Sequence, residues 1–158
     1  MKILWFCNQP LRDQDPSFTG SWLQPMAEGL LGRGSIELAV IAFGPVNRVT
    51  RADFRQVKQW IVPAGLKPGR DGLPRAEVVD AIISAVKSFD PDLVHVWGCE
   101  SFWGLMTARG MLSCPVLLEI QGIKSACAKV FYGGLSVGER LDCIGIKDRA
   151  RHCCKACC

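Results

Sequence analysis

The chain has 158 residues, of which 49% are hydrophobic and 22% are charged. This balance is typical of a globular protein and excludes the low hydrophobicity and high charge of a disordered chain. A domain of this length buries about two-thirds of its unfolded surface, so we expect one domain with a real core and no room for two. The formal net charge is +4, but residues 147–158 hold four cations and one anion, which leaves only +1 for the rest. A nearly neutral body lacks the clustered basic face of a nucleic-acid-binding protein.

The amino terminus reads Met-Lys-Ile-Leu-Trp-Phe-Cys-Asn, an apolar run too short for a signal peptide. No later run approaches the ~18 apolar residues that a membrane-spanning helix needs. We therefore expect a cytoplasmic protein, in which scattered cysteines are isolated thiols rather than disulfides. Five cysteines are scattered in this way: Cys7, Cys99, Cys114, Cys127 and Cys143.

Residues 2–7 form a compact apolar run, which predicts a central strand that ends at Asn8-Gln9-Pro10. A polar loop follows up to Gly20. Apolar residues at three- and four-residue spacing then predict a helix that ends at two glycines near residue 33. Ser21 and Gln24 have the spacing of a capping box, whereas Pro25 favours a helix that begins there. The sequence is compatible with a helix that begins after Ser21 and with one that begins at Pro25.

A second strand is predicted for residues 36–43, which are almost continuously apolar. Residues 50–62 fit either a strand or a helical turn, and we favour the strand. Residues 63–74 contain three prolines and three glycines, which predicts an exposed loop. Apolar residues then recur at helical spacing over residues 75–89, and Asp90-Pro91 ends this helix.

The last predicted elements are a strand at 93–97, a short helix at 102–111, a strand at 116–120 and a helix-prone stretch through Val130. The two strands are short apolar runs that end near a glycine and are joined by a crossover, a pattern typical of a parallel sheet buried on both faces. We predict an α/β fold, a single Rossmann-like domain whose mostly parallel sheet is covered by helices on both faces. Open sheets of this kind bind ligands at the carboxyl ends of their strands.

Three residues near predicted strand ends are candidates for a site. Gly20 would let backbone N–H groups approach a phosphate or sugar at a helix amino terminus, and it is equally explained as a turn glycine. Glu100 would accept or orient a substrate hydroxyl proton, or it is a solvated loop acid. Gln121 would hydrogen-bond sugar hydroxyls, or it caps a loop. The three spaced glycines of a dinucleotide fingerprint are absent, which disfavours a nicotinamide cofactor.

His95 lies inside a predicted strand between two valines, where a buried imidazole that serves packing is the favoured interpretation. The carboxyl-terminal His-Cys-Cys-Lys-Ala-Cys-Cys segment has zinc-ligand spacing at Cys154 and Cys157. A second ligand pair upstream is missing, so we favour terminal disorder or an altered reading frame over a metal site. Four cysteines lie in this segment: Cys153, Cys154, Cys157 and Cys158.

Three segments resemble the amino-terminal half of family 4 glycosyltransferases. They are Lys2–Asn8 with the loop that ends Thr19–Leu23, then Pro91–Gly98, then Pro115–Gly122. Enzymes of this family have two Rossmann-like domains that face each other across a cleft, the GT-B architecture. The resemblance implies that residues 1–146 are the acceptor-side Rossmann-like domain. Residues 147–158 form a basic, Cys-rich tail that has no counterpart in the family, and we expect this tail to be disordered or a truncation artefact.

The resemblance also implies roles for individual residues. Gly20 and Ser21 match the loop that approaches the donor phosphates and sugar. Glu100 falls on the acceptor side of the cleft, and Gln121 stands where many members carry a histidine near the donor sugar. Glu100 and Gln121 are therefore the expected catalytic positions. An amide can hold a sugar hydroxyl but cannot share the proton chemistry of histidine. No cofactor and no required metal are expected, and a nucleotide-sugar is the expected donor.

In the family, a second Rossmann-like domain supplies most contacts to the nucleotide. Charge placed against the departing diphosphate provides most of the acceleration in this kind of catalysis. We therefore expect this chain to be the truncated acceptor-side domain of a retaining glycosyltransferase, inactive alone. The complete enzyme would transfer a sugar to a glycan or lipid-linked acceptor in surface polysaccharide biosynthesis, which is compatible with peripheral membrane association.

Two other interpretations stay open. The first is a non-catalytic α/β interaction subunit that pairs with a separate nucleotide-binding chain. The second is a metal- or thiol-sensing domain built on the Cys-rich tail.

Overall fold

The computed structural model describes residues 1–12, 22–99, 101–120, 126 and 133–139. The chain divides into two compact units, Met1–Gln121 and Gly122–Cys158. The predicted domain boundary at residue 146 falls outside the described residues. Within those residues, no helix has both the length and the apolar character that a membrane crossing requires.

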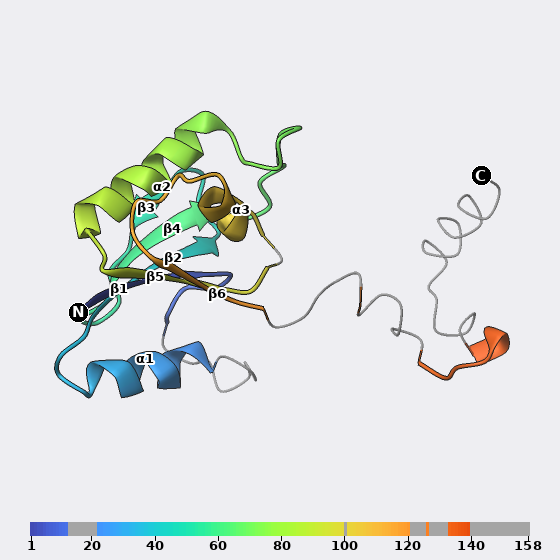
Figure 1. Cartoon of the computed structure of the whole chain (residues 1–158), viewed down its shortest axis with the longest axis horizontal. Coiled ribbons are helices and arrows are strands. Elements are labelled where there is room, and N and C mark those ends of the chain that lie inside the picture. The colour runs from blue at the N-terminus through green and yellow to red at the C-terminus, as the bar shows by residue number, and fades with distance from the viewer. Residues whose placement is uncertain (13–21, 100, 121–125, 127–132, 140–158) are drawn as a thin grey trace. The chain divides into compact units, whose positions relative to one another are not determined.

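Strands and helices alternate along the first unit (Figure 1). The strands are β1 (Lys2–Cys7), β2 (Glu37–Gly44), β3 (Thr50–Arg51), β4 (Lys58–Pro63), β5 (Leu93–Trp97) and β6 (Val116–Glu119). The helices are α1 (Leu23–Leu31), α2 (Ala76–Phe89) and α3 (Trp103–Ala108). The predicted α/β fold with a mostly parallel sheet is confirmed.

The six strands form one sheet in the order β3-β4-β2-β1-β5-β6. All neighbours are parallel except β3, which pairs antiparallel with β4. The chain starts at the centre with β1, builds outward through β2 to β4, then crosses back through α2 to place β5 on the other side of β1. The order of the parallel strands therefore reverses between β1 and β5.

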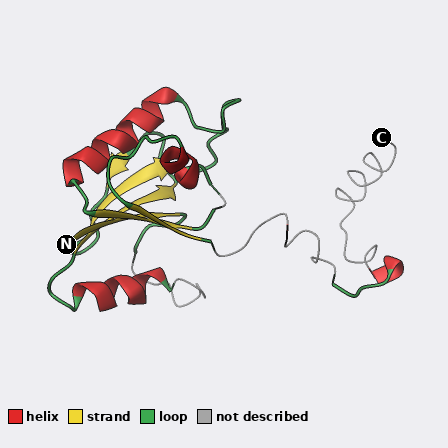
Figure 2. Ribbon diagram, viewed as in Figure 1, coloured by secondary structure: helices red, strands yellow, loops and turns green. Residues whose placement is uncertain are grey.

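Helices cover both faces of the sheet, as predicted (Figures 1 and 2). Right-handed crossovers that run in opposite directions from β1 must place their helices on opposite faces. Accordingly, α1 lies on one face, and α2 and α3 lie on the other (Figure 1). Alternate residues of β1 enter the two cores: Trp5 belongs to the α1 side, whereas Leu4 and Phe6 belong to the α2 side. This double burial explains why the β1 sequence is continuously apolar.

Helix α2 begins and ends close to the predicted positions. Its buried residues recur at helical spacing and include Val79, Ile82 and Val86. The helix ends at Asp90, which adopts the left-handed conformation with φ 55° and donates its N–H to the Val86 carbonyl at 2.9 Å. Because Pro91 follows and cannot continue the helix, the chain turns directly into β5.

Residues 50–62, predicted as one strand, contain two. The turn between β3 and β4 is closed by Phe54 and Val57, whose N–H and carbonyl groups exchange two hydrogen bonds of 2.9 Å. Arg55 within this turn has φ 51°, a left-handed conformation incompatible with a continuous strand. The predicted helix 102–111 is also shorter, since α3 ends at Ala108, just before Gly110 with φ 66°.

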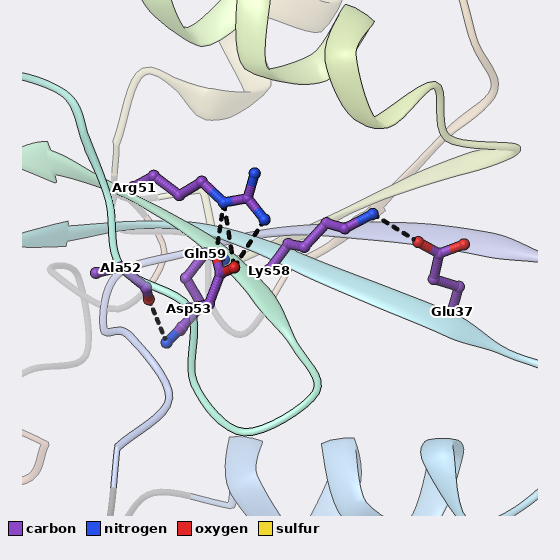
Figure 3. A network of polar contacts seen from close by, with 6 residues as sticks. All are labelled: Glu37, Arg51, Ala52, Asp53, Lys58 and Gln59. Carbon is purple, nitrogen blue, oxygen red and sulfur yellow. Dashed lines mark hydrogen bonds and ion pairs between the residues drawn. The ribbon is translucent and has the colours of Figure 1, made fainter.

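Gln59 on β4 is a buried polar side chain, 2% exposed. It connects β4 by hydrogen bonds to Leu11, in the segment after β1, and to Ala52, just after β3. Its Oε1 accepts the Leu11 N–H at 2.8 Å, and its Nε2 donates to the carbonyls of Leu11 at 3.0 Å and Ala52 at 3.3 Å. Asp53 accepts the backbone N–H of Gln59 and also pairs with Arg51 at 2.7 Å (Figure 3). These bonds fix the chain where it leaves β1.

In the second unit the described residues include one helical turn at 137–139. Ser136 and Glu139 form a capping box: Glu139 accepts the Ser136 N–H at 2.8 Å, and Ser136 Oγ accepts the Glu139 N–H at 3.4 Å. The hydroxyl of Ser136 lowers the pKa of Glu139 by hydrogen bonding to its carboxylate. This turn is stabilised by its own side chains.

Candidate functional site

The carboxyl ends of the parallel strands meet at one edge of the sheet, and ligands of open α/β sheets bind where the strand order reverses. The reversal here lies between β1 and β5. The predicted site residues follow β1 (Gly20 and Ser21), β5 (Glu100) and β6 (Gln121), three neighbouring strands. All four residues lie outside the described residues, as do the four cysteines of the tail.

A pocket of about 450 Å³ opens at this edge, on the face covered by α2 and α3. It lies between the end of β2, the loop after β4 and the start of α3. Its volume falls within the ~300–1,000 Å³ of typical ligand sites. The described residues that line it are Phe43, Ala64, Gly65, Leu66, Pro68, Gly72, Pro74, Ser101, Phe102 and Leu105.

An aromatic cluster joins one side of this pocket to the core. Phe43 stacks on the fully buried Trp103 with ring centroids 4.6 Å apart, and Phe102 lies 4.4 Å from the same indole. Phe6 of β1 contacts Trp103 from the interior at 5.1 Å. Rings packed edge to face or offset hold one another in place, so this side of the pocket is preformed.

The opposite side is the loop after β4, which is attached to the end of α3. Arg109 donates to the Asp71 carboxylate at 3.3 Å and also to the Asp71 carbonyl. The Leu73 N–H and, to a smaller degree, Arg109 lower the pKa of Asp71. Gly72 has φ 81°, and a Cβ there would lie 2.9 Å from the Leu105 side chain. Glycine is therefore needed at this close approach of the loop to α3.

Ser101 supplies the polar side-chain group of the pocket lining that the structure describes. Its Oγ is buried and has no hydrogen-bond partner. A buried hydroxyl without a partner costs free energy, because it has lost its water and gained nothing in return.

A second cluster lies on the opposite face, where His95 and Trp97 of β5 stack at 3.9 Å. Trp97 also contacts Trp5 at 5.3 Å and Trp22, at the start of α1, at 4.6 Å. The Nε1 atoms of Trp5 and Trp97 and the Nε2 atom of His95 are buried without hydrogen-bond partners. The favoured interpretation of His95 as a packing residue fits this stacking.

The His95 imidazole lies 3.5 Å from Glu119 on the neighbouring strand β6. Its side chain is 15% exposed. Burial lowers the pKa of His95, and the nearby Glu119 carboxylate offsets part of this effect. The neutral imidazole is therefore favoured in the folded protein.

Because the folded state binds a proton at His95 less readily than the unfolded state, acid should weaken folding. We expect the free energy of unfolding to fall as the pH drops below 6.5, and the His95→Leu variant to reduce this slope by up to about 1.4 kcal/mol per pH unit. Urea unfolding between pH 5 and 8, followed by tryptophan fluorescence, measures how the free energy of unfolding changes with pH in each protein. Identical slopes for the two proteins would show that His95 does not titrate differently on folding.

Cys7 at the end of β1 is fully buried, and burial raises its pKa to about 12. Its Sγ–H donates to the Gln9 carbonyl at 3.1 Å. The thiol therefore stays protonated at neutral pH and is not a nucleophile. Among the described residues no group of three or more His, Cys, Asp or Glu side chains is arranged to hold a metal ion.

Sequence reasoning did not predict the pocket after β2 and β4. Its lining is apolar and comes from four separate segments, so no local motif marks it. The signal that was present is the run of prolines and glycines at residues 63–74, which was interpreted only as an exposed loop. Leu73 and Pro74 of that loop are buried.

Comparison of the chain with protein families, curated proteins and solved structures finds no match.

Proposed function

We propose that this chain is the acceptor-side, Rossmann-like domain of a retaining GT-B glycosyltransferase that uses a nucleotide-sugar donor. The observation that carries the proposal is the position of the three segments that resemble the family. They form β1, β5 and β6, which are adjacent parallel strands. The loops that would bear Gly20, Glu100 and Gln121 therefore start from one edge, where α/β sheets bind ligands.

The chemistry of the pocket supports the acceptor side rather than the donor side. A diphosphate needs cations or free backbone N–H groups, whereas the described lining of the pocket holds no charged side chain. Arg109, whose contacts attach the loop after β4 to α3, is paired with the Asp71 carboxylate at 3.3 Å. We propose that a separate nucleotide-binding domain supplies the contacts to the donor phosphates.

This proposal makes a prediction for the chain alone. Calorimetric titration with uridine and guanosine diphosphate sugars should give no micromolar binding, and no sugar transfer should be detected. Saturation-transfer NMR with methyl glycosides of common hexoses should show millimolar contact through the sugar-ring protons of at least one of them. Micromolar binding of a nucleotide-sugar, with no ring-proton contact from any glycoside, would contradict an acceptor-side role.

The alternative is a non-catalytic interaction subunit, which the exposed side chains of β6 and the next residue favour. Leu117, Leu118 and Ile120 are 51%, 41% and 55% exposed, and β6 is the last strand of the described sheet. Adjacent exposed apolar residues on an edge strand favour pairing with another chain. Analytical ultracentrifugation of the wild type and a Leu117→Lys variant tests this alternative: concentration-dependent association that the variant abolishes would support it.

A further inference from the structure

The loop after β4 carries exposed positive charge beside the pocket after β2 and β4. Three cations of this loop are exposed: Lys67, Arg70 and Arg75. Lys67 lies between two residues that line the pocket, Arg70 lies two positions from lining residues on both sides, and Arg75 directly follows a lining residue. Lysine and arginine side chains are long and keep their charged ends in water. The charged groups therefore lie within reach of the mouth of the pocket.

These three cations have no carboxylate partner in the part of the chain that the structure describes. Other cations do have one: Arg51, Lys58 and Arg109 each contact a carboxylate, at 2.7, 3.0 and 3.3 Å. The single acid of the loop, Asp71, is the residue that pairs with Arg109. Residues 64–75 hold three cations and one anion, a net charge of +2. Positive charge that no protein group neutralises attracts an anion to this loop.

The walls of the pocket, by contrast, are apolar and accessible. Four apolar side chains of the lining are only half-buried: Phe43, Leu66, Phe102 and Leu105. No charged side chain lies among the described lining residues. Apolar surface of this kind is removed from water most favourably by an apolar group. The interior of the pocket therefore selects an apolar group, whereas its mouth selects an anion.

The loop that joins these two features is held in one conformation. The Gly69 N–H donates to the Leu73 carbonyl at 2.7 Å, and the Asp71 carboxylate accepts the Leu73 N–H at 3.2 Å. Arg109 attaches the same turn to α3. Arg70 lies inside this turn, so its backbone is in place before a ligand arrives. A site that does not have to order its loop on binding keeps more of its contact energy as affinity.

We propose that the pocket binds an amphipathic anion, a single apolar chain that ends in one phosphate or carboxylate. The chain fills the pocket, and its anionic end pairs with Lys67 and Arg70 at the mouth. The proposal goes beyond the proposed function and does not depend on sugar transfer. A nucleotide-sugar does not fit this site, because its diphosphate lies between two polar groups and it has no alkyl chain for the pocket.

Calorimetry with octyl phosphate, octanol and inorganic phosphate, below the micelle concentration of octyl phosphate, tests both halves of the proposal. Octyl phosphate should bind at least about tenfold more tightly than inorganic phosphate, because each buried CH₂ contributes about fourfold. It should bind at least about twofold more tightly than octanol, since an exposed ion pair contributes about 1.4- to 5-fold. Octanol that binds as tightly as octyl phosphate would overturn the anionic half, and inorganic phosphate that does so would overturn the apolar half.

A double variant, Lys67→Gln with Arg70→Gln, locates the anionic end. It should weaken octyl phosphate binding about 2- to 30-fold and leave octanol binding unchanged. The matched control is Arg33→Gln with Lys87→Gln, which removes one arginine and one lysine that are exposed and lie outside this loop. Equal losses in the two double variants would show a general effect of net charge, and the proposal would fail.

A second pair of variants locates the apolar chain. Ala64 is an exposed residue of the lining, so Ala64→Trp should fill the pocket and weaken both octyl phosphate and octanol at least about tenfold. Ala52→Trp, at an exposed alanine that does not line the pocket, should leave both affinities unchanged. If Ala64→Trp binds octyl phosphate as the wild type does, the chain lies elsewhere and the proposal fails.

Vesicles of phosphatidylglycerol and phosphatidylcholine in equal parts distinguish a ligand held in a membrane from a free one. Cosedimentation that octyl phosphate competes away and Ala64→Trp weakens would support a membrane lipid as the source. Octyl phosphate binding without cosedimentation would support a soluble amphiphile. Cosedimentation that Ala64→Trp leaves unchanged, without octyl phosphate binding, would show attraction to a charged surface alone and would overturn the pocket.

Discussion

Trp103→Ala should lower the free energy of unfolding by about 3–5 kcal/mol, the usual cost of truncating a buried large aromatic residue. Trp103 is fully buried and contacts three phenylalanine rings, Phe6, Phe43 and Phe102. Its removal leaves a cavity between the sheet and α3 that the surrounding rings cannot fill. Domains of this size are stable by only about 5–15 kcal/mol, so the loss is a large fraction of the total. Urea denaturation followed by circular dichroism measures the change.

Trp22→Ala is the matched control for that variant. Trp22 is the same residue type at the start of α1, but it is 43% exposed and contacts Trp97 from the outside. Its truncation should cost about 0.5–1.5 kcal/mol, the usual range for an aromatic pair. Equal losses at the two positions would mean that Trp103 does not anchor α3 and the pocket as described.

Gln59→Leu should lower the free energy of unfolding by about 2–4 kcal/mol. The leucine keeps the volume but leaves the N–H and carbonyl of Leu11 without the partners that Gln59 supplies at 2.8 and 3.0 Å. Each buried backbone group left unsatisfied costs about 1–3 kcal/mol, because it has no water to replace the lost bond. Thermal unfolding at neutral pH measures the effect as a drop of roughly 4–16 °C, at about 2–4 °C per kcal/mol for a chain of this size.

Gln56→Leu provides the control on the same β3–β4 hairpin. Gln56 is exposed, so the same chemical change there should alter stability by no more than about 0.5 kcal/mol. If Gln59→Leu is as mild as Gln56→Leu, the Leu11 backbone must find other partners, and Gln59 does not fix the chain after β1.

The order of strands and helices could be predicted because each buried element carries its own local pattern. Residues 2–7 and 93–97 were predicted with the observed bounds, since strands buried on both faces are continuously apolar. Helix α2 was predicted to within a residue because Val79, Ile82 and Val86 repeat at helical spacing. The split at Phe54–Val57 was missed because the left-handed conformation sits at Arg55, where no glycine or asparagine signals it.

The candidate site was less accessible to sequence reasoning for a different physical reason. Gly20, Ser21, Glu100 and Gln121 were chosen as polar or glycine residues after apolar strands, and they lie outside the described residues. The pocket, by contrast, is built from apolar side chains that meet only when β2, β4 and α3 come together. Sequence periodicity identifies which residues are buried but not which of them leave a space between them.

The central position of β1 constrains the order in which the protein assembles on the ribosome. Strand β1 is synthesised before both of its neighbours, and it pairs with β2 on one side and with residues 93–96 of β5 on the other. A nascent chain must therefore hold this apolar strand with one edge unpaired until β5 has emerged. Non-local parallel pairing of this kind slows folding and exposes intermediates to aggregation. We expect β1 to be a preferred binding site for a chaperone during synthesis.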